Sequence, residues 1–161
     1  MSELSSVAGT DARYLLFRVG EELYGTPLLG VREVVEPQAC KKMPNTVPYF
    51  KGLINIRGEI VGVIDLRIRF SQSAEDEGAA LIVFDTDAGA VGALVDQVDS
   101  VLAITEDIID KNPNVGSMVP VEFLVGIAKL EDKLVSLVDL NKTLGNEELS
   151  QLRTTKLSAS A

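Results

Sequence analysis

The sequence contains no histidine and no tryptophan, and a single cysteine, Cys40, among 161 residues. Without histidine the chain cannot carry a Ser-His-Asp or Cys-His nucleophile pair, a histidine phosphoacceptor, or the usual imidazole ligands of zinc. A lone cysteine cannot form an internal disulfide, which fits a reducing compartment. These absences exclude many classes of enzyme.

Several signatures of bound ligands are also missing from the sequence. It has no G-x-G-x-x-G after a predicted strand, no G-x-x-x-x-G-K-[ST] and no C-x-x-C, so the common dinucleotide, nucleoside triphosphate and zinc motifs are absent. Asp85, Asp87, Asp96 and Asp99 are close in sequence but do not follow the spacing of an EF-hand loop. We expect them to form a solvated acidic rim, and we expect no metal, no cofactor and no catalytic activity.

The balance of charge narrows the class of partner. The formal net charge is −9 and no basic run occurs, whereas nucleic-acid affinity depends largely on Lys and Arg neutralising phosphates. No apolar stretch approaches the about 18 to 20 residues that would span a bilayer. Residues 1–10 have neither the basic start nor the apolar run of a secretory signal. We expect a cytoplasmic protein that binds no nucleic acid and does not insert into membranes.

The residues that are present indicate a mainly β fold. Hydrophobic residues make up 46% of the chain and come in short runs rich in Val and Ile, bounded by Gly, Pro, Asn or Asp, which is typical of short strands and turns. We predict strands over residues 14–19, 23–25, 28–35, 53–56, 59–65, 80–84, 91–95, 98–104, 124–130 and 133–138.

The chain also resembles itself. Residues 14–35 align without a gap with residues 81–102, and residues 52–66 align in the same order with residues 126–140, with one loop insertion between the two alignments. Aliphatic strands align easily by chance, but both matches in order favour an internal repeat. Each copy would be marginally stable alone. We therefore predict two small β-barrels with a common core, approximately residues 14–70 and 81–144, joined by 71–80.

Each predicted copy ends in the same way. Asp65 and Asp139 each precede apolar residues four apart, which fits a helical turn with an aspartate N-cap. A catalytic or metal-binding role for these carboxylates is the weaker alternative. Residues 146–153 predict a short C-terminal helix. We expect residues 1–13 to be flexible and residues 150–161 to contain the end of this helix and a flexible tail.

One turn suggests a recognition site. Arg57-Gly58 separates two apolar strands and predicts a tight hairpin that holds an arginine in solvent. The planar guanidinium can bind a carboxylate or amide of a partner directionally. A solvated turn residue without a partner is the alternative, and the residues alone do not decide between the two.

Several sequence blocks resemble those of the CheW family of chemotaxis coupling proteins. They are Tyr24-Gly25, Val31-Arg-Glu-Val34, Pro44 with Pro48, Lys51-Gly-Leu-Ile-Asn-Ile-Arg-Gly58 and Val63-Ile-Asp-Leu-Arg67. The resemblance extends from about Tyr14 to Leu149. No phosphoacceptor or receiver-like segment is attached, so the chain is similar to the stand-alone coupling protein and less to the corresponding domain of the kinase CheA or of CheV.

The resemblance implies two SH3-like five-stranded barrels with an apolar core between them, which agrees with the internal repeat. It also implies a non-catalytic adaptor, monomeric on its own, that couples transmembrane chemoreceptors to the histidine kinase CheA. The partners would be the cytoplasmic tips of the receptors and the regulatory domain of the kinase. The protein would then lie in receptor arrays at the inner face of the membrane.

The resemblance further assigns candidate contact residues. It associates Arg57, Val31 and Val98 with receptor binding, and Glu33, Gly52 and Val101 with binding of the kinase or the array. It does not specify which face of the protein the second group belongs to. Val31 and Val98 are equivalent in the repeat, so both can equally well fill matching core positions. Gly62 departs from the family, where many members have proline; this leaves a backbone N–H available without touching the proposed contacts.

Two other classes of function are weighed against the adaptor. A small-molecule-binding β-barrel, for example a purine binder, would use the cleft between the barrels, but aromatic residues are few, 5% of the chain, and no phosphate-cradling loop is present. A catalytic barrel would need titratable groups that converge in a pocket, and the sequence offers no such group that we recognise.

Overall fold

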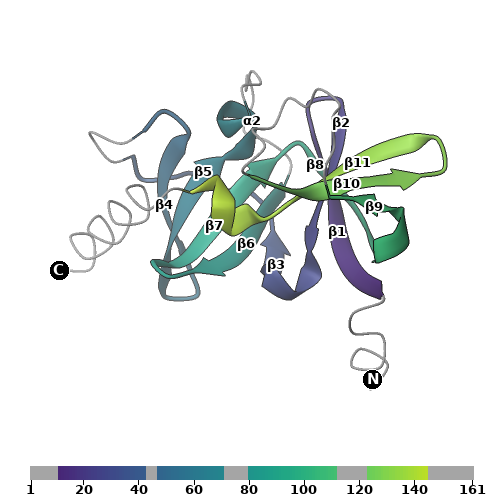
Figure 1. The fold of residues 1–161 in the computed structure, drawn as a ribbon. Coiled ribbons are helices and arrows are strands. Elements are labelled where there is room, and N and C mark those ends of the chain that lie inside the picture. The colour runs from purple at the N-terminus through teal and green to yellow at the C-terminus, as the bar shows by residue number, and fades with distance from the viewer. Residues whose placement is uncertain (1–10, 43–46, 71–79, 112–122, 145–161) are drawn as a thin grey trace.

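The computed structural model describes residues 11–42, 47–70, 80–111 and 123–144 and has a mainly β architecture (Figure 1). The strands are β1 (Asp11–Val19), β2 (Glu22–Pro27), β3 (Val31–Val35), β4 (Phe50–Ile56), β5 (Glu59–Asp65), β6 (Ala80–Thr86), β7 (Gly89–Val95), β8 (Gln97–Thr105), β9 (Ile109–Asp110), β10 (Leu124–Leu130) and β11 (Lys133–Val138). Single helical turns are η1 (Leu28–Gly30), α2 (Leu66–Arg69), η2 (Glu106–Ile108) and η4 (Leu140–Thr143).

The strands form two sheets that lie beside each other in Figure 1. One sheet has the order β8-β1-β2-β11-β10-β9, and the other has the order β3-β6-β7-β5-β4. The predicted repeat relates the two orders strand by strand, with the parallel pair β2–β11 matching the parallel pair β7–β5. The repeat is therefore a repeat of three-dimensional structure and not only of aliphatic sequence.

Each sheet holds the first two strands of one copy and the remaining strands of the other copy. β3 follows β2 in the chain but pairs with β6, and β8 follows β7 but pairs with β1. The predicted ranges 14–70 and 81–144 therefore do not coincide with the sheets, because each sheet takes strands from both ranges. This arrangement joins the two halves through backbone hydrogen bonds, which sequence periodicity cannot reveal.

Three apolar clusters hold the strands together. The largest lies between the sheets and joins Leu15 and Phe17 of β1 to Ile82 and Phe84 of β6, as expected for a common core. Each sheet also encloses a cluster of its own, and the repeat relates their members in pairs: Tyr14 and Leu81, Leu16 and Val83, Leu23 and Ala90, Ala128 and Ile54, Val135 and Val61, Leu137 and Val63. Since neighbouring side chains of a strand face opposite ways, one strand serves both kinds of cluster.

Most of the predicted elements are confirmed with small changes of length. Asp65 caps α2 through the backbone N–H of Arg67, and Asp139 caps η4 through that of Asn141. Residues 28–30 form a 3₁₀ turn instead of the start of a strand, β9 was not predicted, and residues 11–13 belong to β1 and not to a flexible end. The predicted C-terminal helix over 146–153 lies outside the described residues.

Candidate functional site

The hairpin between β4 and β5 displays Arg57 as the sequence predicts. Ile56 pairs with Glu59, so Arg57 and Gly58 form a two-residue loop, and both have positive φ, 50° and 88°. Such a loop matches the twist of the two strands, although the left-handed conformation is slightly strained for an arginine. The side-chain carbonyl of Asn55 accepts a hydrogen bond from the Gly58 N–H at 2.9 Å and supports the turn. The side chain of Arg57 remains 69% exposed.

The structure brings two of the predicted site residues together. The Nη2 group of Arg57 donates to Oε2 of Glu33, which lies on β3 and is 24% exposed. The family resemblance associates these residues with different partners, but they form one ion pair that joins the hairpin to the edge strand. Exposed ion pairs of this type contribute about 0 to 1 kcal/mol to stability, so their role is one of orientation more than of stability.

A second ion pair, not foreseen from the sequence, lies beside the first. Arg32 of β3 donates through Nη1 to Oε1 of Glu59 at 2.6 Å, and through Nη2 and Nε to the carboxylate of Asp85 on β6. Arg32 is the extra residue of a β-bulge, since Val31 pairs with Phe84 and Glu33 with Val83. Bulges redirect side chains and often occur next to functional sites. Asp85 is therefore an ion-pair partner and not only part of a solvated rim.

The other predicted contact residues lie on two different strands. Val31 and Val98 are half-buried and both pack against the common core, which agrees with their equivalence in the repeat and gives them a structural role. Val101 on β8 is 42% exposed, as is its repeat counterpart Val34 on β3. β3 and β8 each end one sheet, so these valines form exposed apolar positions on edge strands.

Gly52 is required by packing. Its φ is +140°, and a Cβ at this position would lie 2.3 Å from the carbonyl oxygen of Lys41. Lys41 forms a bridge with Leu53, with hydrogen bonds in both directions. Gly126, its counterpart in the repeat, allows β9 to approach β10 in the same way, because a Cβ there would meet Ile109 Cγ2 at 2.6 Å. Any contact of Gly52 with a partner would come in addition to this structural role.

A largely buried ionic network joins Asp65 and Arg67, at the end of the first copy of the repeat, to Asp96 between β7 and β8. Arg67 is 2% exposed and binds both carboxylate oxygens of Asp65 at 3.0 Å, while its Nη1 lies 3.2 Å from Oδ1 of Asp96. Asp96 also accepts the backbone N–H of Gly20 at 2.6 Å. The sequence predicted the cap at Asp65 but neither the network nor the part that Asp96 has in it.

Arg69 also links the two halves. Its guanidinium lies 4.8 Å from the ring centre of Tyr49 and 4.6 Å from that of Phe123, and its Nε donates to the carbonyl oxygen of Thr143 at 2.8 Å. The cation is thus held between two aromatic faces from distant parts of the chain. Together with Arg67 it joins distant segments of the two halves of the chain.

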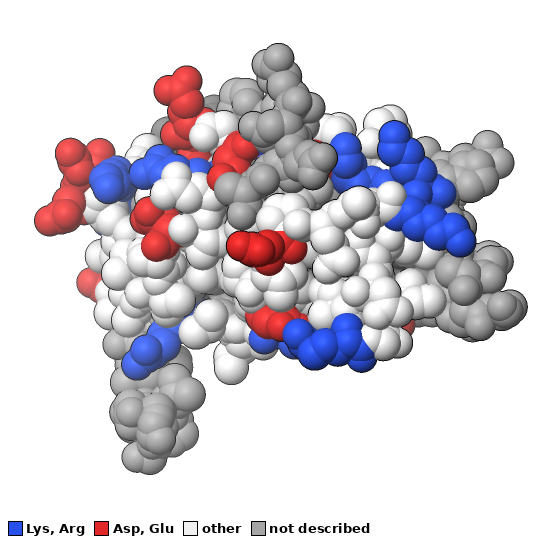
Figure 2. Space-filling view, turned by 180° about the vertical axis from the view of Figure 1, so that it is seen from behind, with Lys and Arg blue, Asp and Glu red and all other residues white. Residues whose placement is uncertain are grey.

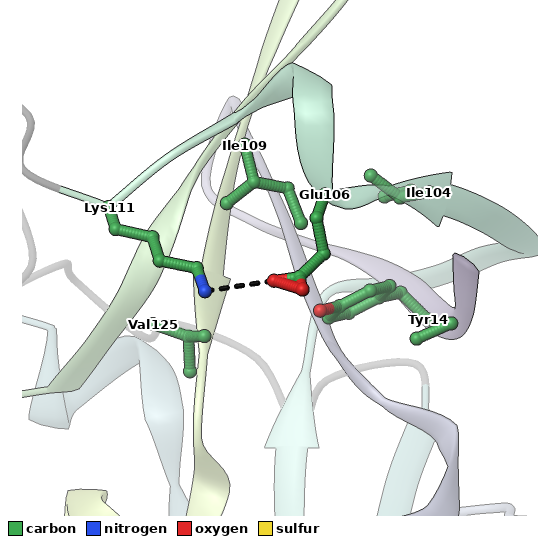
Figure 3. A pocket seen from close by; sticks show the side chains of 7 residues that line it. Tyr14, Ile104, Glu106, Ile109, Lys111 and Val125 are labelled. Carbon is green, nitrogen blue, oxygen red and sulfur yellow. Dashed lines mark hydrogen bonds and ion pairs between the residues drawn. The ribbon is translucent and has the colours of Figure 1, made fainter. Parts of the chain in front are cut away.

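Two small cavities test the small-molecule alternative. One, of about 240 Å³, lies between the sheets and is lined by Thr26, Pro27, Gly30, Phe84, Asp139, Leu140 and Asn141. The other, of about 140 Å³, is shown in Figure 3, where the Glu106–Lys111 ion pair of 2.8 Å lies beside the hydroxyl of Tyr14. Burial, and next the charge of Glu106, raise the pKa of Tyr14. Both cavities are smaller than the about 300 to 1,000 Å³ typical of ligand pockets.

Three observations of the described residues concern nucleic acid, metal ions and membranes. On the face drawn in Figure 2, Lys and Arg form separate groups with acidic side chains between them instead of a continuous basic surface. Among the described residues, no group of three or more His, Cys, Asp or Glu could hold a metal ion. Within the same residues, no helix has the length and apolar character needed to cross a membrane.

Comparison with known proteins identifies the family. Residues 13–148 match the model of the CheW-like domain. The chain belongs to the CheW family. It is 34% identical over 154 residues to the chemotaxis protein CheW of Klebsiella aerogenes, covering 93% of each chain, and 26% identical over 154 residues to that of Treponema pallidum, covering 91% of each. The crystal structure of the scaffolding protein TtCheW from Thermoanaerobacter tengcongensis superposes with a TM-score of 0.77 at 32% identity, covering 85% of this chain and 94% of that one.

Membership of the CheW family confirms the expected fold and functional class. The two sheets are the two SH3-like subdomains of this family, and the chain is a chemotaxis adaptor. The five strands expected of each barrel are found in the β3–β7 sheet, whereas the other sheet has a sixth, two-residue strand, β9. The small-molecule-binding alternative is not favoured.

Proposed function

We propose that this CheW-family chain couples the cytoplasmic tips of transmembrane chemoreceptors to the regulatory domain of the histidine kinase CheA. It acts in the cytoplasm, at receptor arrays on the inner face of the membrane, and has no catalytic activity of its own. The observation that carries the proposal is the Arg57 hairpin, which displays an exposed charged group that an ion pair with Glu33 orients.

The receptor contact is proposed at Arg57 and the strand beside it. A receptor tip is a helical hairpin, and an exposed guanidinium can bind a helix carboxylate through two parallel hydrogen bonds. Glu33 orients Arg57 through the ion pair between them, and Val31, on the same strand as Glu33, packs against the common core, as does Val98. The cleft of about 240 Å³ between the sheets supplies a depression in which apolar anchors of a helix can lie.

The kinase contact is proposed at an edge strand. β8 exposes Val101 and Leu102 by 42% and 41%, and an edge strand with exposed apolar side chains can pack against, or extend, a sheet of another protein. Docking the receptor and the kinase on different parts of one body would hold them side by side, since the common core and the buried ionic network resist relative motion of the sheets.

Co-sedimentation tests the proposal. Membranes bearing a chemoreceptor of the same bacterium are mixed with the cognate kinase, with and without the full-length chain, and the kinase in the pellet is measured. We expect kinase in the pellet only when the chain is present, and faster autophosphorylation in that sample. Equal recruitment of kinase without the chain would contradict the coupling function.

A further inference from the structure

Two ion pairs of opposite polarity join β3 to the β4–β5 hairpin. The hairpin cation Arg57 binds the strand anion Glu33, and the strand cation Arg32 binds the hairpin anion Glu59. Only Gly58 separates Arg57 from Glu59 in the sequence. Glu59 is therefore the carboxylate nearest to Arg57 along the chain, and a glutamate side chain is long enough to compete for a guanidinium on the same turn.

Arg32 keeps Glu59 occupied. It sits at the bulge of β3 and contacts carboxylates of two other strands, Glu59 of β5 and Asp85 of β6, with three of its N–H groups. Hydrogen bonds to Glu59 and then to Asp85 raise the pKa of Arg32 above its ordinary value. Glu59 remains 47% exposed, so it is held by this contact and not by burial.

We infer that Arg32 is a positioning residue: by holding Glu59, it leaves the exposed edge of the Arg57 guanidinium open to a carboxylate of the receptor. This inference rests on the proposed function of Arg57. A guanidinium has five N–H donors in a planar fork, and Arg57 uses one Nη group for Glu33. A released Glu59 would lie on the same hairpin at high effective concentration and would compete with the incoming carboxylate.

The second copy of the repeat supplies a matched control. Asp99 is the bulged residue of β8, since Phe17 pairs with Val98 and Leu16 with Ser100, and it is the counterpart of Arg32. The counterparts of Arg57 and Glu59 are Glu131 and Lys133, so each of the three charges is reversed. No guanidinium is displayed on that hairpin, and a change at Asp99 should not alter binding of a carboxylate to Arg57.

The test measures the dissociation constant of the full-length chain for a soluble cytoplasmic fragment of a chemoreceptor from the same bacterium. We expect Arg32→Ala to weaken binding about threefold to fivefold, the range for loss of an exposed ion-pair contact. Glu59→Gln should leave binding unchanged or slightly tighter. The double variant R32A/E59Q should restore it to within about twofold of wild type, a difference of about 0.4 kcal/mol. Asp99→Ala should have no effect.

The variants separate positioning from simple stabilisation of the hairpin. If Arg32 only fastened the hairpin, Glu59→Gln would weaken binding as much as Arg32→Ala and would not rescue it, and the inference would be overturned. Wild-type binding by Arg32→Ala would also overturn it, while a loss of binding in Arg57→Glu would leave the proposed function standing. Wild-type binding by Arg57→Glu would remove both. Melting temperatures of all variants identify any that fail to fold.

Discussion

Arg57 and Glu131 occupy the same position in two hairpins related by the internal repeat, and each adopts a left-handed backbone conformation, with φ of 50° and 52°. The two side chains carry opposite charges. The same backbone turn therefore displays a cation on one sheet and an anion on the other, and a carboxylate of a partner can bind only the first.

This pair shows how duplication and specialisation coexist in the molecule. The repeat preserves the features that the fold needs, including the bulges at Arg32 and Asp99 and the close approaches at Gly52 and Gly126. The exposed charges at equivalent positions differ in sign. The two ends of the body consequently present different surfaces, as an adaptor between two different proteins requires.

Reversal of the charge at Arg57 should abolish receptor binding without unfolding the chain. Arg57→Glu places a carboxylate beside Glu33 and opposite the receptor carboxylate, and we expect a loss of affinity of at least about tenfold. The melting temperature should stay within about 2 °C of wild type because the pair is exposed. Binding and thermal unfolding are measured on the same sample. Glu131→Arg, on the matching hairpin, is the control and should bind normally; a large loss of stability in Arg57→Glu would indicate a structural role instead.

Substitution of Gly52 should act through stability. Gly52→Ala combines an unfavourable φ of +140° with a Cβ 2.3 Å from the backbone oxygen of Lys41, and we expect a loss of about 1 to 3 kcal/mol in the free energy of unfolding. Denaturant titration followed by circular dichroism measures it. Gly58→Ala is an informative comparison, since its φ is +88° but no atom lies within 4 Å of the added Cβ. Equal losses in the two variants would show that the contact with Lys41 is unimportant.

Neutralising Asp65 should be costly and neutralising Asp139 should not. Asp65→Asn removes the carboxylate charge that pairs with the guanidinium of Arg67, which is 2% exposed, and we expect a loss of about 3 to 5 kcal/mol. Asp139 caps an equivalent turn but has Asn141 in place of the arginine. Because asparagine is also a good N-cap, Asp139→Asn should lose less than about 1 kcal/mol. Chemical denaturation compares them, and similar losses would refute a special role for the buried pair.

The stability of the protein should fall at alkaline pH through Tyr24. Burial, followed by the charge of Glu22, raises the pKa of Tyr24 from 10.0 to about 12. Between pH 10 and 12 the unfolded chain loses the phenolic proton while the folded chain keeps it, so the free energy of unfolding decreases as pH rises through this window and the full contribution is present below pH 10.

Tyr24→Phe is the variant that isolates this effect. The ring would still pack against Phe17 and Phe70, whose centres lie 5.8 Å and 5.1 Å away, so the fold should be retained. Free energies of unfolding measured from pH 9 to 12 should decline less steeply for the variant than for wild type. Parallel curves for the two proteins would assign the alkaline loss to other groups.

The β character, the repeat and the two aspartate caps could be predicted from the sequence because they depend on local patterns. Strand alternation, Gly and Pro at turns, and a carboxylate one residue before a helical turn are properties of neighbouring residues. The hairpin at Arg57-Gly58 belongs to the same class. The contacts of the described residues do not explain why glycine stands at position 62, where the family resemblance leads us to expect proline.

The tertiary structure decided the features that depend on residues far apart in the chain. These features are the division of each copy between the two sheets, the common core, and the ion pairs from Arg32 to Glu59 and Asp85. Each of them joins segments that are separated by loops of no fixed length. Two charged residues far apart in the sequence form an ion pair only after the strands that carry them have assembled into the sheet. By itself the sequence determined which residues could form strands, turns and caps; the three-dimensional packing determined which charges meet and which of them a partner can reach.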